Sequence, residues 1–150
     1  MAIDIRPALH QDVEPLAALE YQAYGADGYP SALFYQALVQ WPDGFFVATR
    51  GQQVCGYVLA TPGTDHTPWV MSLLIAESAR GQGIGRQLMQ YLLDQLRAKP
   101  TNYTQIALTV APDNQHALRL YQQLGFQQRE AIPNFMGPQH DRLLLIATIQ

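Results

Sequence analysis

A short glycine-rich segment at residues 80–86 constrains the fold of this chain more than any other feature. It reads RGQGIGR and places three glycines at alternate positions, between an apolar run over 69–75 and a strongly helical run over 84–97. This order predicts a strand, a tight loop and the start of a helix. Because glycine has no Cβ, the loop's N–H groups can converge on one point, and the helix N-terminus adds partial positive charge. The segment therefore predicts a cradle for an anion, favouring a pyrophosphate, between Arg80 and Arg86.

Two common phosphate-binding signatures do not fit this segment. Nucleoside triphosphate loops need Gly-Lys followed by Ser or Thr, whereas here Gly85 is followed by Arg86 and Gln87. Dinucleotide fingerprints need an acidic residue at the end of the next strand, and the nearby Asp113 lies in the turn after that strand. A turn that only joins two elements rarely needs three glycines and two arginines. Coenzyme A is the third option and the one we expect.

A second segment, residues 111–126, has the sequence APDNQHALRLYQQLGF. An Asn, an Ala, a Leu-Tyr pair and a Gly-Phe pair follow one another in one predicted helix and its exit. With the preceding Arg-x-x-Gly-x-Gly pattern, this segment resembles the GCN5-related N-acetyltransferase (GNAT) superfamily, and within it the ribosomal-protein alanine N-terminal acetyltransferases. The resemblance is specific over residues 69–131, while the N-terminal third matches only in the layout of its elements.

Composition narrows the remaining classes. A chain of 150 residues suits one domain, and 48% hydrophobic with 14% charged residues argues against disorder. The net charge of −3 and the lack of a basic run argue against nucleic acid as a partner. No apolar stretch is long enough for a membrane span, and the start lacks the apolar region of a signal peptide. A single cysteine, Cys55, fits a core residue in a reducing cytoplasm. We expect a cytoplasmic protein, with a homodimer left open.

The pattern of apolar residues predicts an α/β (α+β) fold with one domain over residues 1–150. We expect a mixed central sheet of about seven strands with about four helices. The expected strands are 3–6, 45–50, 53–61, 70–75, 105–110, 126–131 and 142–148, and the expected helices are 12–24, 31–39, 84–97 and 114–125.

Details of the helices follow from capping and periodicity. Asp12 and Ser31 are expected to cap the first two helices, and the third is expected to stop at Lys99 and Pro100. The first helix is expected to place four side chains on one face, namely Val13, Leu16, Ala17 and Tyr21.

The resemblance implies acetyl transfer from acetyl-CoA to a primary amine. In that fold the strand before the glycine loop and the strand after its helix, strands 4 and 5, splay apart, and the pantetheine arm lies in the gap. No metal is implied. Carried onto this chain, the cofactor-binding residues are Leu73, Leu74 and Ile75 through their backbone, with Arg80, Gly81, Gln82, Gly83, Ile84, Gly85, Arg86, Asn114 and Tyr121.

The resemblance also assigns Tyr121 as the general acid toward the leaving thiolate. A phenol has a pKa of ~10 and a thiol of ~8.5, so complete proton transfer is uphill by roughly 2 kcal/mol and a hydrogen bond is the expected role unless the pKa is tuned. From the residues alone, Tyr121 also fits a core aromatic, and Asn114 also fits a helix cap.

A general base is missing from the expected place. The relatives carry a glutamate on the strand after the third helix, and the matching position here is Thr109. The sequence leaves several other candidates open: Ser72 on a strand, Asp65, His66 and His140 in loops, and Glu20 on the first helix, which no motif supports.

The absent carboxylate favours an α-amine as acceptor. An α-amine with a pKa of ~8 is about 20% neutral near pH 7.4, whereas a lysine-like amine is only about 0.1% neutral. The segments 134–138 and 141–143 resemble the hairpin that covers the peptide in N-terminal acetyltransferases, with Phe135 and Met136 in place of its tyrosines. Two alternatives stay open: a small-molecule acetyltransferase acting on a polyamine, amino acid or drug, and a non-catalytic acyl-CoA-binding module.

Overall fold

The computed structural model describes residues 2–99 and 101–149 and contains the expected elements in the expected order. The strands are β1 (Ile3–Pro7), β2 (Phe45–Arg50), β3 (Gln53–Thr61), β4 (Trp69–Ile75), β5 (Gln105–Val110), β6 (Gln127–Ile132) and β7 (Arg142–Thr148). The helices are α1 (Val13–Tyr24), α2 (Ser31–Gln40), α3 (Ile84–Ala98) and α4 (Gln115–Gln123), with short 3-10 turns η1 (His10–Asp12), η2 (Gly25–Asp27), η3 (Pro42–Gly44) and η4 (Glu77–Ala79). Pro100, expected to end the third helix, lies outside the described residues. None of the described helices is long and apolar enough to cross a membrane.

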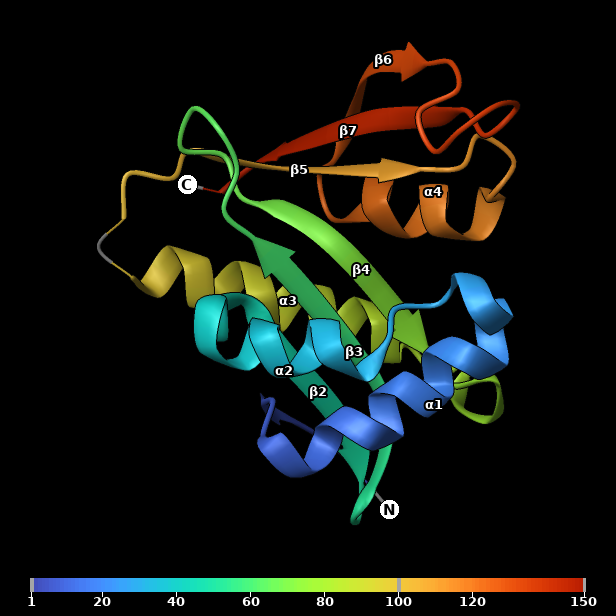
Figure 1. Ribbon diagram of the computed structural model, residues 1–150. Coiled ribbons are helices and arrows are strands. Elements are labelled where there is room, and N and C mark those ends of the chain that lie inside the picture. Colours follow the sequence, from blue (N-terminus) through green and yellow to red (C-terminus); the bar gives the residue numbers. More distant parts are fainter. Residues whose placement is uncertain (1, 100, 150) are drawn as a thin grey trace.

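All seven strands form one mixed sheet in the order β1-β2-β3-β4-β5-β7-β6. Every neighbouring pair is antiparallel except β4 and β5, which are parallel and register at a single pair, Trp69 with Ala107. Beyond that pair the two strands diverge (Figure 1), which confirms the predicted splay. One extra residue, Met71, bulges from β4, because Leu59 pairs with Ser72 while Ala60 pairs with Val70. A bulge bends and twists a strand, and this one lies just beyond the point where β4 and β5 part.

Two apolar clusters cover the two faces of the sheet, as side chains that alternate along a strand require. Along β2, Phe45 and Val47 pack with α1 and α2, whereas Phe46 and Ala48 pack with α3. Figure 1 shows α2 and α3 on opposite sides of strands β2 to β4. Cys55 is a buried member of the α3 cluster, as expected. The sheet is therefore held from both sides up to the gap between β4 and β5.

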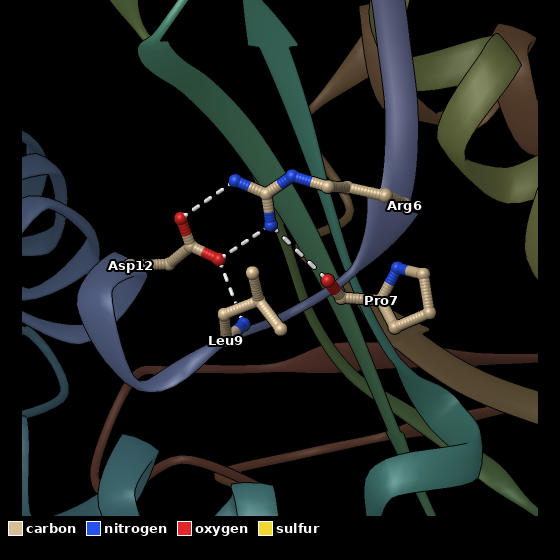
Figure 2. Close-up of polar contacts among 4 residues, drawn as sticks. All are labelled: Arg6, Pro7, Leu9 and Asp12. Atoms are coloured by element: carbon tan, nitrogen blue, oxygen red, sulfur yellow. Dashed lines mark hydrogen bonds and ion pairs between the residues drawn. The ribbon is translucent and has the colours of Figure 1, made fainter.

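The two expected side-chain caps at the start of α1 and α2 are wrong. The Asp12 carboxylate makes no cap bond to α1; it accepts the N–H of Leu9 at 2.7 Å and two bonds from the Arg6 guanidinium at 2.7 and 3.0 Å (Figure 2). A nearby cation outcompetes the helix N–H groups for this carboxylate, because bonds between charged groups are stronger. Ser31 donates to Glu14 at 2.8 Å instead of capping α2. Both side chains thus tie α1 to its neighbours.

Candidate active site

A cavity of about 940 Å³ occupies the gap where β4 and β5 part. This volume lies at the upper end of the range usual for ligand pockets. We call one end of the cavity the glycine-loop end, formed by residues 73–75, 80–81, 83–86 and 114. The other end, the carboxylate end, is formed by Glu20, Tyr24, Asp27, Tyr29, Met136 and Arg142. Tyr121 also lines the cavity.

The glycine-loop end presents a row of unpaired backbone donors. Gly81 and Gly83 have φ angles of 77° and 78°, a left-handed conformation that only glycine adopts without strain. Gly83 caps α3 without any side-chain bond, and within the described residues none of the amides 81–86 donates a hydrogen bond to the protein. The first amide of this region that does is Gln87, to the Gly83 carbonyl at 3.1 Å. Such a row of donors at a helix N-terminus fits a diphosphate.

The polar side chains of this end are mostly engaged with the protein. Arg80 donates to the Ile75 carbonyl at 3.2 Å, and Arg86 donates to the Gln123 amide oxygen at 2.7 Å. The Gln82 side chain accepts a bond from Arg50 and, unlike Arg80 and Arg86, does not line the cavity. Arg80 and Arg86 are exposed, so they add positive charge around the amides.

The free edge of β4 runs along the cavity. Leu73, Leu74 and Ile75 line it, and their ladder with β3 occupies the other edge of the strand. Within residues 2–99 and 101–149, β4 registers with β5 only at Trp69, so the backbone groups farther along this edge have no strand partner there. An extended ligand segment can bond such an edge, which is the role predicted for these three residues.

One face of α4 supplies two more cavity residues, Asn114 and Tyr121. The Asn114 side chain accepts the Ala117 N–H at 3.1 Å and so caps the helix, while its own NH₂ remains available to a ligand. Tyr121 is 9% exposed and packs edge-on against Phe126. Burial raises the pKa of Tyr121 to about 12; the neighbouring Tyr24 adds to the rise and Arg142 opposes it. Tyr121 is therefore a neutral hydroxyl donor at the cavity wall.

A buried carboxylate marks the other end. Glu20, on α1, is 1% exposed and lines the cavity. Its Oε1 accepts a bond from the Tyr57 hydroxyl, and its Oε2 accepts the Tyr29 N–H at 3.2 Å. The Ser72 hydroxyl lies 2.7 Å from the Tyr57 oxygen and extends this network onto β4. No cation lies within 4.0 Å of Glu20 among residues 2–99 and 101–149.

The buried face of α1 differs from the predicted one. Tyr21 was expected on that face but is 70% exposed, and the buried side chains are Val13, Leu16 and Glu20. Glu20 follows Leu16 by four residues and so lies on the same side of the helix. A carboxylate at an apolar position of an amphipathic helix is the sequence signal for this residue, since charged groups are rarely buried without a function or a partner.

The remaining candidate bases divide into two groups. Thr109 and Ser72 line the cavity, but a hydroxyl does not accept a proton near neutral pH. Asp65, His66 and His140 lie on connecting segments and do not line the cavity. Among the candidates from the sequence, the structure brings one carboxylate into the cavity, Glu20.

Comparison with known proteins gives the same family that the motifs suggest. The model of the acetyltransferase (GNAT) family matches residues 10–126. An N-alpha-acetyltransferase, RimI of Mycobacterium tuberculosis, is 32% identical over 123 residues, which is 78% of this chain and 73% of the relative.

Solved structures share the whole fold. Ard1 from Thermoplasma volcanium superposes with a TM-score of 0.88 at 24% identity, covering 100% of this chain and 99% of the other. A chain of the NatC complex bound to Gag peptide and CoA gives a TM-score of 0.85 at 20% identity, with 100% of both chains covered. With the cavity, the glycine loop and the family match together, the chain belongs to the GNAT family and is an acetyl-CoA-dependent N-acetyltransferase.

Proposed function

We propose that this enzyme acetylates the α-amino group at the N-terminus of a protein or peptide. The observation that carries the proposal is Glu20, a buried carboxylate that lines the cavity and has no cation partner among the described residues. A buried carboxylate without a cation is costly, and an ammonium group entering the cavity would supply one. Several relatives named N-alpha-acetyltransferases support the choice of an α-amine. A cytoplasmic location belongs to the same proposal, since the single cysteine is free and buried.

In this proposal the glycine-loop end holds the acyl donor. The amides of residues 81–86 bind its diphosphate, the free edge of β4 at 73–75 bonds the pantetheine arm, and Asn114 donates to it. When bound, acetyl-CoA supplies a thioester carbonyl and a thiolate leaving group. Backbone amides of β4 can also donate hydrogen bonds to the thioester carbonyl oxygen in the gap between β4 and β5.

The carboxylate end prepares the amine. Glu20 binds the ammonium, and a carboxylate with about four lone-pair sites can do so while keeping its bonds to Tyr57 and Tyr29. The ammonium first loses one proton to water, and the neutral amine then attacks the thioester carbonyl. The attacking nitrogen becomes more acidic, and Glu20 accepts its second proton as the C–S bond breaks and the thiolate leaves. An α-amine is already about 20% neutral near pH 7.4, so this assistance suffices without a second base.

On this proposal Tyr121 acts by hydrogen bonding. With its pKa near 12, full proton transfer to a thiolate of pKa ~8.5 would cost about 5 kcal/mol. A neutral phenol can instead donate a strong bond to the sulfur as charge develops on it. Burial moves the pKa of Tyr121 away from that of the thiol, which supports a hydrogen-bonding role over proton transfer.

The proposal is tested by kinetics on an acceptor panel of N-terminal peptides, polyamines and lysine side chains. We expect turnover of peptides with a free α-amine, and a fall in kcat/KM of about 100-fold in Glu20→Gln with acetyl-CoA affinity unchanged. Glu14→Gln is the matched control, because Glu14 lies on the same helix, is exposed and does not line the cavity. Turnover restricted to polyamines or lysine side chains would overturn the α-amine assignment, and full activity in Glu20→Gln would remove Glu20 from the mechanism.

A further inference from the structure

A second charged side chain of the carboxylate end has no partner among the residues that the structure describes. Arg142, the first residue of β7, is half-buried and lines the cavity. Within the described ranges 2–99 and 101–149 its guanidinium forms neither a hydrogen bond nor an ion pair. A guanidinium carries five N–H donors in a planar fork, so Arg142 offers a complete donor set to the cavity.

The carboxylates near Arg142 either bond other groups or lie more than 4.0 Å from its guanidinium. Glu20 and Asp27 are the carboxylates that line the cavity, and neither approaches the guanidinium within 4.0 Å. Asp141, the preceding residue in the chain, accepts the Asn134 N–H at 2.9 Å and so braces the connection between β6 and β7. Arg142 is therefore left without an anion by the part of the chain that the structure describes.

Arg142 also differs from the other arginines of the cavity. Arg80, Arg86 and Arg119 come from the glycine loop, the start of α3 and α4, at the end that faces the diphosphate site. The charge of Arg142 instead acts on the phenols of both Tyr29 and Tyr121. It is the cation of the carboxylate end.

Tyr29 lines the cavity together with both charged groups. Its backbone N–H bonds Glu20, and burial raises its pKa, with Glu20 adding to the rise and Arg142 opposing it. The carboxylate end thus carries an anion on α1 and a cation on β7. A ligand that fills both positions carries an amine and an anionic group in one molecule.

The wall beside Arg142 is held in place by its own hydrogen bonds. In the connection from β6 to β7, the Met136 N–H bonds the His140 carbonyl at 3.0 Å, and the Gln139 N–H bonds the Asn134 side chain at 2.8 Å. This loop presents Met136 to the cavity and leads directly into Arg142. The guanidinium is therefore presented from a braced segment, which favours selective recognition over adaptable contact.

We propose that Arg142 binds a carboxylate close to the acceptor amine, so that the preferred substrates are peptide N-termini with an acidic side chain within their first residues. This inference rests on the proposed function. Arginine matches a carboxylate with two parallel bonds, while Glu20 receives the amine of the same molecule. The same chemistry occurs in a free amino acid, whose own carboxylate stands next to its amine, and the experiment separates the two sources.

The experiment measures kcat/KM on pairs of peptides with a free α-amine that differ only by Asp against Asn, or Glu against Gln, at one of the first three residues. Wild type should favour the acidic member of at least one pair by about tenfold, and added salt should reduce this ratio. In Arg142→Gln the ratio should fall to near one, and Arg142→Glu should shift the preference toward Lys-containing peptides. Arg129→Gln is the matched control, because Arg129 is an exposed residue of β6 outside the cavity, and it should keep the wild-type ratio.

The outcomes separate this inference from the proposed function. Equal turnover of acidic and neutral peptides by wild type, or an unchanged ratio in Arg142→Gln, overturns the role of Arg142 while peptide acetylation stands. Alanine and alaninamide form the second arm: if alanine is favoured and no peptide is acetylated, the peptide assignment fails and carboxylate recognition by Arg142 stands. If no acidic substrate of either kind is favoured, Arg142 has no recognition role.

Discussion

The two ends of the cavity are built in different ways. At the glycine-loop end, contiguous main-chain amides at 81–86 provide the donors, and side chains contribute little. At the carboxylate end, separate side chains line the cavity: Glu20 from α1 and Arg142 from β7. Tyr57 on β3 and Ser72 on β4 form a hydrogen-bond network with Glu20. Backbone recognition suits a ligand common to a whole family, whereas recognition by separate side chains can change from one member to the next.

The substitution Gly85→Ala, which adds one methyl group, has the largest expected effect. It tests whether main-chain amides provide most of the acetyl-CoA affinity at the glycine-loop end. A Cβ there would meet Leu120, Ile75 and Leu73 at 3.6 to 3.9 Å, which is ordinary contact, so the protein itself tolerates it. All three neighbours line the cavity, so the methyl would stand where the ligand approaches. Gly85→Ala should keep the free energy of unfolding and weaken acetyl-CoA binding about 100-fold, which is about 2.7 kcal/mol.

Calorimetry with acetyl-CoA and urea unfolding measure the two quantities separately. Gln87→Ala, an exposed change one residue beyond the amide row, should leave both unchanged. Tight binding of acetyl-CoA by Gly85→Ala would mean that the ligand does not approach this glycine. Recognition by the main chain would then not explain binding at the glycine-loop end.

Removing the Tyr57 hydroxyl tests the carboxylate end, because Tyr57 donates a hydrogen bond to Glu20 and does not line the cavity itself. Tyr57 is fully buried, and a hydrogen bond to a charged group contributes about 1.5–3 kcal/mol. Tyr57→Phe should therefore lower the free energy of unfolding by about 2 kcal/mol in urea titrations near pH 7. Tyr91→Phe is the control, since the Tyr91 hydroxyl has no hydrogen-bond partner among the described residues.

The difference in free energy of unfolding between wild type and Tyr57→Phe should depend on pH in the alkaline range. Burial, with the bond to Glu20 adding, raises the pKa of Tyr57 far above its ordinary value, so this hydroxyl stays protonated in the folded state. In the unfolded chain it ionises above about pH 10. The stability that Tyr57 contributes is complete below that pH and is lost above it, so wild type and Tyr57→Phe should converge by about 1.4 kcal/mol per pH unit above 10. A stability difference that stays constant up to pH 11 would contradict a buried hydrogen bond between Tyr57 and Glu20.

The sequence predicted the two ends with unequal success, and for a physical reason. Glycines at alternate positions and the Asn-to-Tyr spacing of α4 are local, so the glycine loop before α3 and the cavity wall with Asn114 and Tyr121 could be predicted from short segments. The splay of β4 and β5 followed from the resemblance. Glu20 and Arg142 are 122 positions apart in the chain, and only the packing of α1 on the sheet and the pairing of β7 with β5 bring both to one cavity. The missed caps at Asp12 and Ser31 have the same origin, since partners from other segments took those side chains.

Tyr121→Phe has a smaller expected effect. Tyr121 lines the cavity but belongs to neither of its two ends as defined above. If Tyr121 donates a hydrogen bond but not a proton, its loss should lower kcat about tenfold, equivalent to about 1.4 kcal/mol, with acetyl-CoA affinity nearly unchanged. Since its pKa is about 12, wild type and variant should share the same pH profile of kcat up to about pH 10. A falling limb that begins near pH 9 in wild type and disappears in the variant would instead indicate a general acid with a lowered pKa.

Arg86→Gln has the smallest expected effect. It compares the contribution of a side-chain charge with that of the main-chain amides at the glycine loop. Arg86 is exposed and already bonded to Gln123 at 2.7 Å, so its charge is largely screened by water and salt. Acetyl-CoA affinity should fall only about threefold at low ionic strength, and the difference should vanish in high salt, with Arg129→Gln as the control for net charge. If Arg86→Gln weakened binding as much as Gly85→Ala, the charge of this side chain and not the main-chain amides would provide most of the affinity. The small expected loss therefore tests, from the opposite direction, that backbone geometry holds the diphosphate.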